Sequence, residues 1–254
     1  MQPMDMVRLD NQLRAVDASP GGRLLSAWRE LDDSFYALVK NASDALGIDR
    51  LANSDDVLFE LWDIDNRDDL DRVTREASRL FLNFLGSASA LADHTSRHVA
   101  EFDDKDLRRE YQAHIAASML NTPTHQLVQG LRNISQHRFL SLSGSAFTMK
   151  RSGGQDSEFE STHSFVIGKD FLLAAQTWQD PVVNYLNRPP GNQDDTMGHN
   201  DVDVAWLVRS YTEMAIATHR WLRDREAKIH SGDIREYEAR RNALLAHDST
   251  DPEG

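Results

Sequence analysis

The segment from Arg132 to His137 holds an arginine, an adjacent amide in Asn133 and a terminal histidine, and these three could act together on a phosphodiester. Arginine is a permanent cation whose forked donors fit a phosphate. Histidine can take up and release protons near neutral pH. RNA cleavage at the 2′-hydroxyl needs a base, an acid and a cation that stabilises the crowded phosphate. Arg132 could supply the cation and His137 the acid or the base, while Asn133 could orient the imidazole or contact the sugar.

Helical geometry limits how these side chains can meet. On an ideal α-helix, residues five apart point about 140° away from each other. Asn133 and His137 are four apart and share a face, whereas Arg132 does not. The three side chains therefore meet only at a distorted helix end or across an interface with a second chain. The alternating apolar and polar residues that begin at Phe139 predict that the helix ends near His137.

The motif, late in a predicted helix, resembles the signature of the HEPN superfamily, in which an arginine is followed by a histidine a few residues later, often with a polar residue directly after the arginine. The flanking residues Leu127 to Leu131 and His137-Arg138 also resemble members of this group. The resemblance is specific around the motif and loose over the surrounding helices. It implies a helical bundle that dimerises and places two copies of the motif in a shared cleft.

This resemblance also implies a function. Many members are metal-independent endoribonucleases of toxin–antitoxin or phage-defence systems, which would make Arg132, His137 and Asn133 the catalytic residues here. We therefore expect an endoribonuclease that forms a homodimer, uses RNA as its substrate, needs no cofactor or metal, and could bind an antitoxin or another protein. The alternative is a catalytically inactive HEPN-like module that binds or regulates a protein partner.

Composition narrows the class of protein. The chain has 254 residues and a formal net charge of −13, whereas proteins that coat nucleic acid non-specifically are usually basic. On a protein this acidic, only a local cleft that presents a few cations would attract RNA. The absence of cysteine excludes disulfides and thiolate metal sites. No apolar run approaches the roughly 18–20 residues of a membrane helix, and the N-terminus lacks the apolar stretch of a signal peptide. These features predict a soluble, cytoplasmic protein with no membrane partner.

The expected fold class is all-α, a HEPN-like helical bundle with a small inserted antiparallel β-hairpin. Apolar residues at helical spacing predict most of the elements, and Gly47 is expected to end the first of them. The predicted helices cover residues 23–46, 57–62, 68–102, 105–120, 123 to the motif, 169–178, 180–186, 201–229 and 233–246. The predicted partition is an N-terminal arm or tail over 1–22, one domain over 23–247 with the hairpin at about 139–168, and a C-terminal tail over 248–254.

A second constellation is a pair of histidines, His94 and His98, four residues apart on the predicted long helix. This spacing can present two imidazoles to one metal ion. A zinc site would need a further ligand from Asp93, Glu101 or His114. Such a site would support a metal-dependent hydrolase, whereas histidines on a partly exposed helix face are more often structural.

Overall fold

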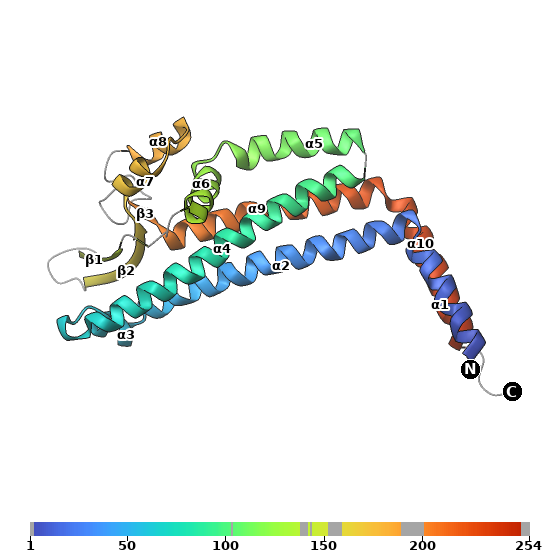
Figure 1. Ribbon diagram of the computed structural model, residues 1–254, viewed down its shortest axis with the longest axis horizontal. Helices are drawn as coiled ribbons and strands as arrows, with labels where there is room; N and C mark the ends of the chain where they lie inside the picture. Colours follow the sequence, from blue (N-terminus) through green and yellow to red (C-terminus); the bar gives the residue numbers. More distant parts are fainter. Residues whose placement is uncertain are drawn as a thin grey trace.

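Three long helices set the shape of the protein in the computed structural model, which describes residues 3–102, 104–137, 142, 144–151, 159–188 and 201–249. Figure 1 shows α2 (Pro20–Ala52), α4 (Arg67–Glu101) and α9 (Val204–Ile229) running lengthwise beside one another. The short α3 (Asp55–Leu61) and the 3₁₀ turn η1 (Ile64–Asn66) reverse the chain between α2 and α4. These two helices are therefore antiparallel neighbours.

A second layer covers the side of α4 and α9 that is turned away from α2 (Figure 1). It consists of α5 (Lys105–Ile115), the π-helical turn η2 (Ala116–Leu120) and α6 (Pro123–His137). The short helices α7 (Lys169–Ala175) and α8 (Asp180–Leu186) lie beyond α6. An ion pair between Arg225 of α9 and Glu110 of α5, with Nη2 and Oε1 2.7 Å apart, joins the two layers.

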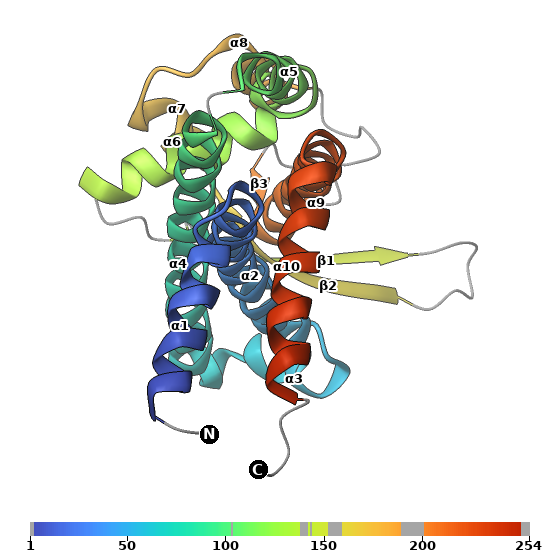
Figure 2. The same ribbon diagram turned by 90° about the vertical axis from the view of Figure 1, so that its right-hand side faces the viewer.

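The predicted hairpin is present, and a third strand extends it. Strand β1 (Gly144–Arg151) pairs antiparallel with β2 (Phe159–Ile167), and β2 pairs with the two-residue β3 (Val202–Asp203), which the sequence pattern did not predict. Figure 2 shows the hairpin projecting sideways from the helices. Residues 139–141 and 143 of the expected first strand, the loop 152–158 and the loop 189–200 lie outside the described residues.

An asparagine fixes β2 to the end of α2. The His163 N–H donates to Asn53 Oδ1 at 2.7 Å, and Asn53 Nδ2 donates to the His163 carbonyl at 2.9 Å. The amide of Asn53 thus makes the pair of hydrogen bonds that a neighbouring strand would make. The His163 side chain is only 2% exposed and packs against Trp62 and Phe165.

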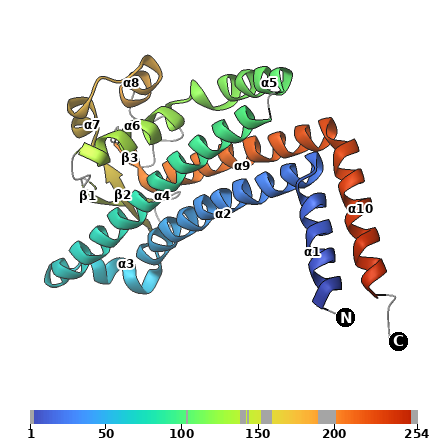
Figure 3. The same cartoon turned by 45° about the vertical axis from the view of Figure 1, so that its right-hand side comes forward.

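The N-terminal and C-terminal helices pack together away from the main body. Figure 3 shows α1 (Pro3–Asp17) and α10 (Ser231–Ser249) leaving the end of the long helices side by side. The hydroxyl of Tyr237 donates to Asp17 Oδ1 at 3.1 Å. A Cβ on Gly21 would lie 2.3 Å from the Asp233 carbonyl oxygen, so the close approach of α2 to α10 needs glycine there. Most of the expected N-terminal arm is thus helical.

Most of the predicted helices are confirmed. The apolar residues that predicted them lie on the helix faces that the structure buries. The expected end at Gly47 is wrong, since α2 continues to Ala52 and is capped by Asn53. Ala45 and Ala52 are buried on both sides of Gly47, and their packing holds the helix through the glycine. The C-terminal helix also runs further than expected, to Ser249. Nor did the sequence pattern reveal helix α1.

One hydrophobic cluster joins α2, α4, α5, α6 and α9 and continues into the sheet. Its fully buried large side chains include Leu38, Phe84, Leu107, Leu131 and Tyr211. This core fixes the positions of α6 and of the end of β2. Within the described ranges, no helix is long and apolar enough to cross a membrane.

The buried imidazole of His163 makes the stability of the protein pH-dependent. Burial lowers the pKa of His163 from 6.5 to about 4. Between these two values the unfolded chain binds a proton that the folded chain does not, so stability falls as the pH falls. We expect this residue to account for a loss of about 2 kcal/mol between pH 7 and pH 5.

Urea unfolding of the wild type and of His163→Phe at both pH values measures this loss. Asp49, whose pKa is raised to about 6 chiefly by burial, titrates in both proteins and cancels in the comparison. The variant should lose less stability than the wild type on acidification. Equal losses in the two proteins would contradict the assignment.

Candidate functional site

Helix α6 carries the arginine–histidine motif on its polar side. Pro123 lies in its first turn, and the apolar side chains of Leu127, Val128, Leu131 and Ile134 form the buried face that meets α4 and α9. The motif residues fall outside this face. Arg132 is half-buried, while Asn133 and His137 are exposed.

The described part of α6 runs to His137, and the residues that would show the predicted helix end, 138–141, lie outside the described residues. Arg132 still lies within regular helix, and its carbonyl accepts a hydrogen bond from Ser135 Oγ at 2.7 Å. Among the described residues, no hydrogen bond or ion pair joins Arg132, Asn133 and His137 to one another. All three residues belong to α6, and on a regular helix Asn133 and His137 share a face while Arg132 lies about 140° around the helix from His137.

Gly130 allows α6 to pack closely against the segment that follows α7. A Cβ on Gly130 would lie 2.2 Å from Cζ3 of Trp178 and 2.3 Å from the amide nitrogen of Gln176. The indole of Trp178 is held in place by a hydrogen bond, because its Nε1 donates to the Leu172 carbonyl at 2.6 Å. The missing side chain at Gly130 therefore sets how closely α6, and with it the motif, approaches this part of the protein.

We expect Gly130→Ala to destabilise the protein by about 1–3 kcal/mol, because a methyl group there forces the indole and the helix apart. Equilibrium unfolding in urea measures the change. Gly86→Ala is the matched control, since Gly86 lies inside α4 with no atom within 4 Å of the added Cβ. That control should be neutral or slightly stabilising. An unchanged midpoint for Gly130→Ala would contradict the packing described.

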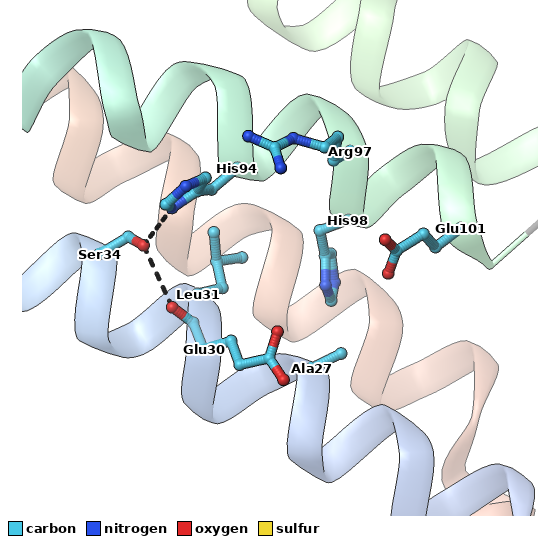
Figure 4. Close-up of a pocket in the computed structure, with 8 residues that line it drawn as sticks. All are labelled: Ala27, Glu30, Leu31, Ser34, His94, Arg97, His98 and Glu101. Carbon is cyan, nitrogen blue, oxygen red and sulfur yellow. Dashed lines mark hydrogen bonds between the residues drawn. The ribbon is translucent and has the colours of Figure 1, made fainter.

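The histidines His94 and His98 do not face a common ligand position. Figure 4 shows them on α4, above α2, lining a small cavity of about 180 Å³ with Glu30, Arg97 and Glu101. The ring of His94 hydrogen-bonds the hydroxyl of Ser34, whereas His98 Nε2 lies 2.7 Å from Glu226 Oε1 on α9. In the part of the chain that the structure describes, no three His, Asp or Glu groups are placed to hold a metal ion.

His98 instead belongs to a buried polar cluster that ties the three long helices together. Glu226 is completely buried and also accepts a hydrogen bond from Trp28 Nε1 at 2.7 Å. A neighbouring pair, His219 Nε2 and Asp32 Oδ1, lies 3.0 Å apart. The guanidinium of Arg223 stacks over the Trp28 ring at 3.6 Å. These contacts stabilise the crossing of α2, α4 and α9.

A larger cavity of about 320 Å³ lies between α4, α5, α6 and α9. The part of α6 that precedes the motif contributes His125 and Gln129 to its wall. Sequence patterns did not reveal this cavity, because its other polar residues come from distant helices. The only local signal is the placement of His125 and Gln129 on the same helix as the motif.

Comparison of the chain with protein-family models, with curated proteins and with solved structures found no match.

Proposed function

We propose that this protein is a metal-independent endoribonuclease and that the end of α6 is its active site. The observation that carries the proposal is the exposure of His137, where the described part of α6 ends, and of Asn133, which lies one turn earlier and next to the half-buried Arg132. An exposed imidazole at a helix end can approach a bound polynucleotide. Because Arg132 is half-buried, its guanidinium group can adopt only a limited set of positions.

The proposed reaction uses the 2′-hydroxyl of RNA as the nucleophile. His137 takes the proton from that hydroxyl or gives one to the leaving 5′-oxygen, and water carries out the other proton transfer. Arg132 stabilises the charge that develops on the phosphate through charge-assisted hydrogen bonds. Asn133, on the face of His137, orients the imidazole or contacts the sugar. The products are a 2′,3′-cyclic phosphate and a free 5′-hydroxyl.

Two otherwise identical oligonucleotides test this proposal. One is single-stranded RNA, and the other carries 2′-deoxyribose at every position. The protein should cleave the first in the presence of a chelator and leave the second intact, because the deoxy strand has no nucleophile. Cleavage of both strands would contradict the mechanism. Cleavage of neither would favour the protein-binding alternative.

The divergence of Arg132 from His137 leads us to propose that the active unit is a homodimer. In a dimer with a two-fold axis, the arginine of one copy can complete the site of the other. Mixing Arg132→Ala with His137→Ala distinguishes this arrangement. Random subunit exchange makes half of the dimers mixed, each with one intact site of two, so about a quarter of wild-type activity should return. No recovery on mixing, with exchange verified, would contradict the shared site.

A further inference from the structure

The cavity of about 320 Å³ beside α6 has the properties of a site for a neutral, flat molecule. Its volume is near the lower end of the roughly 300–1,000 Å³ typical of ligand pockets, which suits a single ring system. It reaches the surface at Ser96 and Leu120, which are both exposed. None of the described residues that line it is a lysine, arginine, aspartate or glutamate. A charged group would find no counter-charge there, whereas an uncharged ring needs none.

Aromatic and polar groups in the wall match a heteroaromatic ring. The ring of His125 stacks on Tyr211, with their centroids 6.1 Å apart and the planes 14° from parallel. Nδ1 of His125 is buried and, within the described residues, has no hydrogen-bond partner. Burial lowers the pKa of this histidine, so its neutral ring offers one donor and one acceptor. Gln129, which lines the cavity together with Tyr211, brings an amide to the same wall.

A second histidine is held in a fixed orientation. Asp32 binds Nε2 of His219 at 3.0 Å, and Phe35 stacks on the ring with centroids 4.2 Å apart. A carboxylate that accepts from Nε2 leaves Nδ1 as the acceptor of a neutral imidazole. The cavity therefore holds oriented donors and acceptors between apolar surfaces. Recognition of a base needs both its stacking face and its hydrogen-bonding edge.

The position of the cavity relative to the motif identifies the occupant. At 100° per residue, His125, Gln129 and Arg132 lie within about 60° of one another on α6. Gln129 and Arg132 are three apart, so their Cβ atoms are about 5–6 Å from each other. One ribose separates the base of a nucleotide from its 3′-phosphate. A base next to Gln129 would thus bring its own phosphodiester to Arg132.

We infer that the cavity between α4, α5, α6 and α9 binds an unpaired nucleobase of the RNA and thereby selects the phosphodiester that is cleaved. This inference rests on the proposed ribonuclease function, although occupancy of the cavity can be measured without any cleavage. The base enters from the side of Ser96 and Leu120. Its hydrogen-bonding edge meets His125, Gln129 and His219.

The test uses Ala92→Phe in the full chain, because Ala92 lines the cavity and a phenyl group there takes up part of its space without removing a polar group. Ala100→Phe, the same substitution at an exposed position of α4, is the control. Ligand-observed NMR with each of the four ribonucleosides should show binding of at least one to the wild type and to the control. Ala92→Phe should weaken that binding about ten-fold or more. If this variant does not fold, Gln129→Leu, which removes only the amide, should weaken binding in the same way.

A mixed-sequence RNA then separates the cavity from the catalytic site. The wild type should prefer one base next to the cleaved bond, and Ala92→Phe should lose that preference and about ten-fold in kcat/KM. Nucleoside binding without RNA cleavage would support the cavity and contradict the proposed function. RNA cleavage that is unaffected by Ala92→Phe would overturn the cavity inference and leave the proposed function standing. A wild type that binds no nucleoside at millimolar concentration would also overturn it.

Discussion

His137→Ala should reduce RNA cleavage by about 10²–10⁴-fold, which is the usual contribution of a general acid or base. His137 is the last residue of α6 and its side chain is exposed, so its removal costs no buried contact. The variant should therefore fold and melt like the wild type. The rate of cleavage of a fluorescent single-stranded RNA, measured at saturating and at limiting substrate, reports the loss.

The control for this experiment is Gln136→Ala, since Gln136 is the exposed neighbour of His137 on the same turn. It should keep most of the activity. If His137→Ala cleaved RNA as fast as this control, His137 would not be the acid or base. In that case any cleavage by the wild type would have to come from another part of the protein.

Glu226→Ala should have the largest effect on stability, a loss of about 3–5 kcal/mol. The carboxylate is completely buried on α9 and accepts one hydrogen bond from Trp28 on α2 and another from His98 on α4, each at 2.7 Å. Removing it leaves two buried donors without an acceptor and opens a cavity where three helices cross. Urea unfolding measures the loss of free energy.

Two further variants show whether the buried cluster is responsible. Glu213→Ala removes an exposed carboxylate from the same helix and should change the stability by less than about 0.5 kcal/mol. A double-mutant cycle of Glu226→Ala with Trp28→Phe should give a coupling of about 1 kcal/mol or more, because the two residues share a hydrogen bond. A loss below 1 kcal/mol for Glu226→Ala, or additive effects in the cycle, would show that the cluster contributes little.

The helices of this protein could be predicted from the sequence because periodic apolar residues record which face is buried. Leu127, Leu131 and Ile134 predicted the inner face of α6, and the structure buries them. Periodicity does not record which helices meet. The contacts of Glu226 with Trp28 and His98 span 198 and 128 residues, so nothing local to any of these residues indicates them. For the same reason His98 could be read as a metal ligand beside His94.

The limits of helix prediction have equally specific causes. Gly47 resembles a helix end, but Ala45 and Ala52 pack on both sides of it and tertiary contacts override its weak propensity. Strand β3 has only two residues and forms because β2 offers an edge. Two residues are too few to show the alternation of apolar and polar side chains that predicts a strand.

The sequence predicted where the motif lies on a helix, but it did not predict which other residues lie beside it. The apolar residues before His137 predicted the helix that carries the motif, and α6 is described up to that residue. The cavity beside Gln129 depends on side chains from α4, α5 and α9, which no local pattern brings together. The partner arginine that we propose from a second copy depends on an interface that a single chain does not contain.

The chemistry of the RNA ends tests the central claim most directly. Purified wild-type protein is incubated with a defined single-stranded RNA in excess chelator, and the products are identified by mass spectrometry. Metal-independent transesterification at Arg132 and His137 predicts 2′,3′-cyclic phosphate and 5′-hydroxyl ends that are absent with His137→Ala. Ends with 5′-phosphate, or cleavage that stops when the chelator is added, would contradict it.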